Sequence, residues 1–243
     1  MLGTFLIAVL GVLAASLLRG FTGFGFGLAA VPLLSLALPP ARVVPFVTVL
    51  QVLVGMAGLR EARSLADWRA VFGLLPGMVL GIPLGLLVLT EFSPNHARLA
   101  IGVLIAVSVV VLLQRLQLPS RPTRSLTLGV GVASGVMNGL ASMGGPPVVV
   151  YLLALPMEAA QVRASSIVYF LMASAITATP MAAKGLVDRE VLLWSAASVP
   201  VLLAGNWLGS WAFTRATPRH HRITALAVLS VLAVMLIVRA LFD

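Results

Sequence analysis

The chain of 243 residues contains no cysteine, and charged residues make up only 9% of it. The absence of cysteine excludes disulfides, iron–sulfur clusters, thiolate metal sites and cysteine nucleophiles. Acidic residues are also few, and all seven fall in expected loops or at the chain end. No carboxylate relay of the kind found in proton pumps is therefore visible. A phosphate-binding Gly-x4-Gly-Lys-Ser/Thr loop is lacking too, so ATP-driven transport would need another chain.

Hydrophobic residues make up 60% of the chain, which is far more than a soluble core needs. A helix that crosses the roughly 30 Å hydrocarbon layer needs about 20 apolar residues. Six segments predict such helices: 43–59, 70–89, 97–113, 162–183, 191–213 and 223–241. Because they are apolar on every face, they favour an all-α polytopic membrane protein over a β-barrel.

The formal net charge of +9 comes from Arg residues in short connections between the apolar segments. In a soluble protein such a charge would suggest binding to nucleic acid. Here the Arg residues lie in the connections between apolar segments, which is the pattern that orients membrane proteins. We therefore expect no nucleic-acid partner. The first apolar run has no Lys or Arg before it and leads into a glycine-rich segment rather than a cleavage site. We therefore expect it to be a retained membrane segment.

An internal repeat divides the chain. A shift of 124 positions aligns Pro76, Gly81, Gly85, Pro94 and His96 with Pro200, Gly205, Gly209, Pro218 and His220. Nearer the start the offset shortens, so that Gly20 and Pro32 align with Gly135 and Pro147. We interpret the chain as two homologous halves, an N-terminal transmembrane repeat of residues 1–120 and a C-terminal one of residues 121–243. The glycine pairs four residues apart predict close helix contacts.

Each half is predicted to start with a Gly-broken or re-entrant helical segment. Residues 2–38 are almost continuously apolar, but as one helix they would reach about 55 Å. The glycine-rich stretch 19–27 interrupts this run, and 134–147 holds the same place in the second half. Backbone groups that are unpaired at membrane depth need partners from protein or water. The two breaks therefore predict one cavity near the midplane, where helix N-termini favour an anion.

The direction of the halves depends on how each broken segment crosses the bilayer. If each crosses once, the loop and tail cations divide nine against six, and if each folds back they divide ten against five. The positive-inside rule favours the second arrangement, in which the halves are inverted repeats and both termini lie outside. Parallel halves remain the alternative.

The expected substrate-binding residues lie at the two breaks. Arg19 stands where the first apolar helix meets the glycine-rich stretch, so a buried guanidinium there would neutralise an anion; the alternative is that it reaches the membrane interface. The other expected substrate-binding residues offer hydroxyl, amide or backbone N–H groups: Gly20, Thr22, Gly23, Gly25, Ser134, Asn138, Ser142, Gly144 and Gly145. For any one of the polar side chains, helix packing is an equal alternative.

Other polar residues are expected to have structural roles. Gln51 lies inside the second apolar segment, and bonding to a neighbouring helix is favoured over lining the transport path. Arg98 and Arg222 follow the aligned prolines together with His96 and His220. We expect these residues to lie at the level of the lipid headgroups, although gating or pH sensing is an alternative.

The two breaks resemble the sulfite exporter TauE/SafE family of small, duplicated permeases. The residues that carry the resemblance are the stretch Gly20 to Gly27 with Pro32, and Ser134-Gly135 followed by Gly144-Gly145-Pro146-Pro147. The resemblance covers nearly the whole chain. It implies transport of sulfite, organosulfonates or related sulfur oxyanions. The stretch from Asn138 to Ser142 departs from the family's usual Gly- or Phe-rich pattern, which leaves the substrate open.

We therefore predict a secondary transporter, and more specifically an exporter, of a small anion in the bacterial inner membrane. Its expected partners are that small anionic substrate and the lipid bilayer; no cofactor is expected, and a homo-oligomer is left open. One alternative is a membrane scaffold or assembly subunit without transport activity. A membrane-embedded enzyme would need acid, base or metal groups within the bilayer, and three loop His residues supply them poorly.

Overall fold

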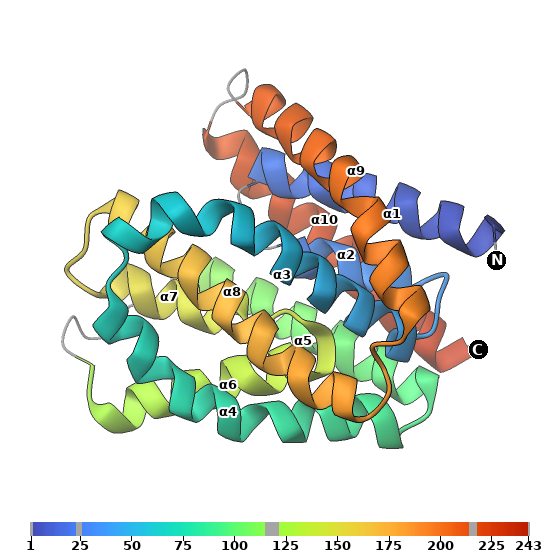
Figure 1. The fold of residues 1–243 in the computed structure, drawn as a ribbon, viewed down its shortest axis with the longest axis horizontal. Helices are drawn as coiled ribbons and strands as arrows, with labels where there is room; N and C mark the ends of the chain where they lie inside the picture. The colour runs from blue at the N-terminus through green and yellow to red at the C-terminus, as the bar shows by residue number, and fades with distance from the viewer. Residues whose placement is uncertain (1, 23–25, 115–121, 214–217, 243) are drawn as a thin grey trace.

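The computed structural model describes residues 2–22, 26–114, 122–213 and 218–242 (Figure 1). Over these ranges it contains ten α-helices and no strand. The helices of the first half are α1 (Leu2–Thr22), α2 (Phe26–Ser35), α3 (Pro40–Leu65), α4 (Trp68–Glu91) and α5 (Pro94–Gln114). Those of the second half are α6 (Arg124–Ala141), α7 (Gly145–Ala154), α8 (Ala159–Ala183), α9 (Arg189–Phe213) and α10 (Pro218–Phe242).

Five described helices are long and apolar enough to cross a bilayer: Gly3–Gly20, Trp68–Glu91, Pro94–Gln114, Ala159–Ala183 and Arg189–Ala212. The last four confirm the predicted crossings at 70–89, 97–113, 162–183 and 191–213. The predicted crossing at 43–59 lies in α3, whose arms Pro40–Met56 and Gly58–Leu65 meet at an angle of 68°. The crossing at 223–241 lies in α10, whose described apolar part, Leu226–Phe242, is a shorter helix.

Local sequence explains where several helices begin. Asp67 caps the N-terminus of α4 by accepting a hydrogen bond from the Ala70 N–H (3.0 Å), and Thr123 caps α6 through Leu126 N–H (3.3 Å). Side-chain oxygens at this position satisfy N–H groups that have no partner inside the helix. Proline begins α3 at Pro40, where its missing N–H costs nothing.

Glycines let the two halves approach each other closely. A Cβ added to any of six glycines would meet backbone atoms of the facing helix, where α4 packs on α6: Gly77, Gly81, Gly85, Gly131, Gly135 and Gly139. The contact of α1 with α9 is similar, because a Cβ on Gly20 would meet Asn206 and Ser210, and one on Gly205 would meet Ser16. The predicted close helix contacts at Gly81, Gly85 and Gly205 are confirmed.

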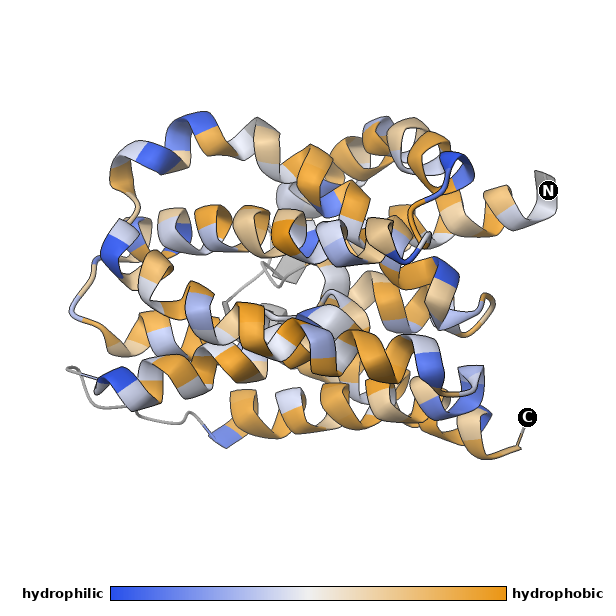
Figure 2. Ribbon diagram, turned by 60° about the horizontal axis from the view of Figure 1, so that its bottom comes forward, coloured by the Kyte–Doolittle hydropathy of each residue, from blue (hydrophilic) through white to orange (hydrophobic). Residues whose placement is uncertain are grey.

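Each half pairs with the other in a reciprocal pattern. The first helix of one half packs on the fourth helix of the other (α1 on α9, α6 on α4), the third helices pack together (α3 on α8), and so do the fifth (α5 on α10). Both chain ends lie at the same end of the bundle, which we call the terminal end (Figure 1). Apolar residues cover the lengths of the helices and polar residues gather near the two ends (Figure 2).

Candidate functional site

The second predicted break separates α6 from α7. Helix α6 ends at Ala141, and Ser142 adopts a left-handed conformation with φ of 49°. The Ser142 N–H donates to Asn138 O (2.8 Å) and the Met143 N–H to Met137 O (3.3 Å), the bonding that commonly ends a helix. Glycine usually occupies such a position because a Cβ is disfavoured there. A serine at this turn places a hydroxyl where most helix ends have none.

Buried side chains on α6 and α8 hold the break in place. The Ser134 hydroxyl donates to Gly144 O (2.7 Å) and accepts from the Tyr169 hydroxyl (2.8 Å). Asn138 donates to Ala173 O (3.2 Å) and to Thr177 Oγ1 (2.7 Å), and its Oδ1 accepts from the Gly144 N–H (3.4 Å). These bonds satisfy polar groups that would be costly to bury unpaired.

The first half reaches the same turn through α2 and α3. Thr48 of α3 hydrogen-bonds the Ser142 hydroxyl, and Gln51 donates to Ser142 O (3.1 Å). Gly27, in the first turn of α2, packs so closely that an added Cβ would overlap the Ser142 carbonyl group. The segment that follows the first break therefore touches the second break directly.

A small cavity of about 20 Å³ lies where these segments meet. Its walls come from α2, α3, α6, the turn before α7, and α8: Gly27, Leu28, Gln51, Asn138, Ser142, Met143, Gly144, Gly145, Phe170 and Ser174. Helices α2 and α7 both begin here, and the N–H groups of a first helical turn have no partner within the helix. The cavity therefore combines two helix N-termini, which carry partial positive charge, with amide and hydroxyl side chains. Its volume holds about one water molecule.

Arg98 secures the far end of α2. This side chain is buried, with 9% of its surface exposed, and it donates to Ser35 O (3.0 Å) and Asn95 Oδ1 (2.7 Å). A cation at the C-terminus of a helix stabilises the carbonyl groups that end there. The structure shows that the Arg98 side chain is buried against the C-terminal end of α2, and its position at the level of the lipid headgroups stays a prediction.

The structure brings four of the predicted site residues together on the cavity wall: Asn138, Ser142, Gly144 and Gly145. Ser134 lies one layer behind and bonds Gly144. Gly20 packs against α9, and Arg19, in the last turn of α1, is not among the residues that line the cavity. Gly23, Gly25 and the side chain of Thr22 lie outside the described residues.

Several residues that line the cavity or bond its wall were not in the predicted site. Gln51, which we expected to pack, does bond a neighbouring segment as predicted, but it also lines the cavity. Thr48 was missed altogether, although a hydroxyl within the apolar run 43–59 was a visible signal. Gly27 belongs to the glycine-rich stretch, but nothing in the sequence distinguishes it from its neighbours; only the contact with Ser142 does so.

Comparison with known proteins places this chain in a family. Residues 7–236 match the family model described as sulfite exporter TauE/SafE. The chain belongs to this family. Its members are transporters rather than enzymes, so the chain is a multi-pass membrane protein of a transporter family. It is 28% identical over 228 residues to the "Probable sulfite/organosulfonate exporter TauE" of Cupriavidus necator, covering 91% of this chain and 88% of that protein. No solved structure matches.

Proposed function

We propose that the chain exports a small oxyanion, such as sulfite or an organosulfonate, across the bacterial inner membrane, and binds it between the N-termini of α2 and α7. One observation carries this proposal: the segments that follow the two breaks meet at Gly27 and Ser142 and line one polar cavity. Helix N-termini, hydroxyls and amides all donate hydrogen bonds to oxyanions. The similarity to the Cupriavidus protein supports the sulfur-oxyanion class.

We further propose that residues 1–120 and 121–243 form inverted repeats. The reciprocal helix pairing supports this, and so does the fold-back of α1 and α2, because Thr4 and Leu38 line one cavity near the terminal end. In this topology the connections at the opposite end carry ten Arg and Lys residues and those at the terminal end carry five. The positive-inside rule then makes the terminal end the outer side.

Transport through this site requires movement. A cavity of about 20 Å³ admits about one water molecule, so an oxyanion enters only after the walls separate. Alternating access in inverted-repeat transporters moves one half against the other around a fixed site. The backbone-to-backbone glycine contacts of α4 with α6 and of α1 with α9 provide smooth surfaces for such movement.

Arg19 is proposed to attract the anion on its way to the cavity. No carboxylate lies within 4 Å of it among the described residues, and Arg163 is near enough to interact with it electrostatically. Two positive charges that have no carboxylate within 4 Å in the described part of the chain favour an anionic ligand.

The proposal is tested by flux in proteoliposomes over a panel of sulfite, ethanesulfonate and longer sulfonates. We expect saturable, anion-dependent flux, which Arg19→Ala weakens by raising the half-saturating concentration. Arg60→Ala, at an exposed position of α3, is the matched control and should leave flux unchanged. Equal behaviour of the two variants rejects the role of Arg19, and absence of flux for the whole panel rejects transport of these anions.

The small size of the cavity favours one other candidate function, a membrane scaffold or assembly subunit in which the breaks serve only as packing sites. This alternative predicts no flux for any anion. It also predicts that substitutions in the cavity change stability without changing transport.

A further inference from the structure

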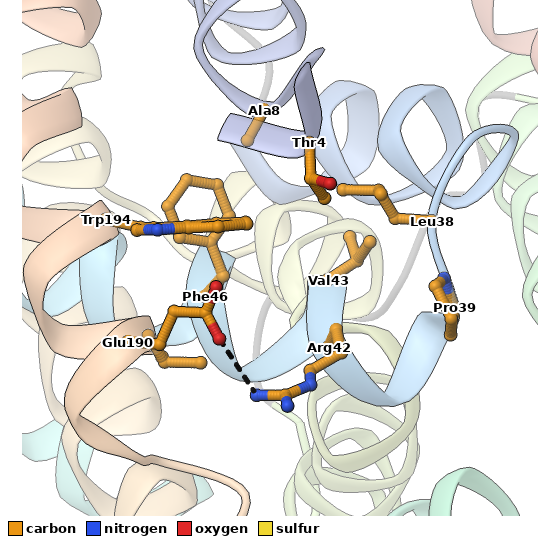
Figure 3. Close-up of a pocket in the computed structure, with 10 residues that line it drawn as sticks. Thr4, Ala8, Leu38, Pro39, Arg42, Val43, Phe46, Glu190 and Trp194 are labelled. Carbon is orange, nitrogen blue, oxygen red and sulfur yellow. Dashed lines mark ion pairs between the residues drawn. The ribbon is translucent and has the colours of Figure 1, made fainter. Parts of the chain in front are cut away.

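A second and larger cavity lies at the terminal end, away from the two breaks. Its volume is about 230 Å³, compared with about 20 Å³ for the cavity at the breaks. It lies between the start of α1, the connection from α2 to α3, and the start of α9 (Figure 3). Leu38, Val43, Phe46 and Trp194 form apolar walls, and Arg42 and Glu190 lie together on one side. Such a cavity accommodates a small organic molecule with one charged group.

Among the residues that the structure describes, Arg42 is the one guanidinium on the wall of this cavity. Two carboxylates compete for it. Its Nη1 lies 2.5 Å from Asp188 Oδ2 and 4.0 Å from Glu190 Oε2. The side chains of Arg42 and Asp188 are 57% and 39% exposed, so water screens the pair and the bond is easily exchanged. An oxyanion in the cavity is a third competitor for the same guanidinium.

Asp188 is held in position by a second interaction. Its Oδ1 accepts from the Val191 N–H (2.8 Å) and caps the start of α9, while Oδ2 binds Arg42. The carboxylate therefore stays beside Arg42 even when an anion has displaced it. A tethered competitor acts at a high effective concentration, so Asp188 promptly recovers the guanidinium.

The opposite end of the molecule lacks this arrangement over the ranges that the structure describes. Asp67 caps α4 as Asp188 caps α9, and Arg163 stands near the start of α8 as Arg42 does near the start of α3. However, no carboxylate lies within 4 Å of Arg163 there. Within the described ranges, competing carboxylates beside an arginine are thus found at the terminal end only, which makes the two ends chemically different.

We propose that the cavity beside Arg42 is the outer exit site for the transported oxyanion, and that Asp188 and Glu190 expel the anion by taking Arg42 back. This inference rests on the proposed function and on the assignment of the terminal end to the outer side. The leaving anion pairs with Arg42 while its organic part, where it has one, lies on Phe46 and Trp194. Guanidinium pairs well with planar and tetrahedral oxyanions. Low affinity at the outer side is what a unidirectional exporter needs, because a tightly bound product would slow release.

The decisive variant is Asp188→Asn, because asparagine still caps a helix through its side-chain oxygen but no longer competes as an anion. We expect it to lower the half-saturating concentration of external ethanesulfonate and sulfite by up to about five-fold, the range of exposed ion pairs. Arg42→Gln should raise that concentration beyond measurement. The measurement is uptake into proteoliposomes that carry the protein with its terminal end outward, with external anion varied.

The matched control is Lys184→Gln. Lys184 pairs with Glu91 (3.2 Å) at the same end of the molecule and also joins the two halves, but it does not line the cavity. If the Arg42–Asp188 pair only holds the halves together, Asp188→Asn and Lys184→Gln will alter transport alike and neither will tighten anion binding. That result would overturn the inference, and so would stronger binding of a cation than of either anion. If the wild-type protein transports anions but Asp188→Asn leaves the external affinity unchanged, only the exit site is rejected. If the wild-type protein shows no flux, the proposed function itself is rejected.

Discussion

Gly27 packs its main chain directly against the carbonyl group of Ser142, and this contact joins the two interrupted segments. A Cβ on Gly27 would overlap that carbonyl and lie 3.2 Å from Gln51 Nε2. The carbonyl belongs to the backbone of a left-handed turn, so it has little freedom to move away. Only glycine fits at this position of α2.

Gly27→Ala should therefore lower stability and abolish transport. We expect a loss of about 1–3 kcal/mol, as for other overpacked sites, because the added methyl group pushes α2 away from the cavity. Thermal unfolding in detergent and flux in proteoliposomes measure the two effects.

Gly129→Ala is the control for Gly27→Ala. Gly129 lies inside α6, and a Cβ added there meets nothing within 4 Å. Alanine in a helix interior is better than glycine by about 1 kcal/mol, so this variant should be at least as stable as the wild type. If Gly27→Ala leaves both stability and flux unchanged, then α2 and the turn at Ser142 can move apart without loss of stability, which would contradict the prediction.

The hydroxyl of Tyr169 offers a second test. It donates to Ser134 Oγ (2.8 Å), which in turn holds Gly144 O at the cavity. Tyr169→Phe should cost about 1 kcal/mol, the usual contribution of one hydrogen bond, and should also reduce flux because the turn before α7 loses support.

Tyr151→Phe separates these two effects. The Tyr151 hydroxyl bonds Thr127 Oγ1 (2.9 Å) away from the cavity. We expect a similar loss of stability with normal flux. If both variants transport equally well, the Ser134 network is structural only.

The sequence predicted much of the framework. Four of six crossings follow from apolar length alone, and the interruption at Ser142 follows from the small residues and prolines around it. The glycine spacing in Gly81 and Gly85 predicted their backbone contacts. These features depend on local composition, which a single sequence displays directly.

Long-range relationships were not predictable in the same way. The contacts of Ser142 with Thr48 and Gln51 join positions 94 and 91 residues apart, and nothing in an apolar run marks which side chain faces inward. Arg98 follows a proline at a helix start, and nothing in the sequence showed that its side chain would be buried against Ser35. The bend in α3 also has no proline or glycine pattern that distinguishes it from the unbent α4.

Arg98 gives a third prediction. Arg98→Met keeps an apolar side chain of similar length but leaves Ser35 O and Asn95 Oδ1 without their donor. Ser35 is fully buried and Asn95 is half-buried. A buried acceptor left unpaired costs about 1–3 kcal/mol, so we expect a clear fall in melting temperature. Arg98→Lys should recover part of the lost melting temperature, because one ammonium group can reach one of the two acceptors but not both in the same geometry.

Asp188 gives a fourth prediction, on pH. Its pKa is held below the usual range, first by the hydrogen bond from the Val191 N–H and then by the hydrogen bond and charge of Arg42, which together outweigh the opposing effect of burial. The groups that face this carboxylate are Arg42 of α3 and Glu190 and the Val191 N–H of α9. A lowered pKa in the folded state means that the ionised form is stabilised by folding.

This contribution to stability is complete above the unfolded pKa of about 3.9 and is lost as pH falls through the lower folded value. Wild type and Asp188→Asn should therefore show a constant difference in melting temperature from pH 7 to pH 5. Below about pH 4 the difference should shrink as Asp188 takes up a proton. In Arg42→Gln the carboxylate loses its cation, so its folded pKa moves toward the usual range. The acid-dependent loss should then begin at the same unfolded pKa but be smaller and be complete at a higher pH than in the wild type. Melting curves of the three proteins in one detergent measure this, and a difference that disappears between pH 7 and pH 5 would show that another group controls the contact.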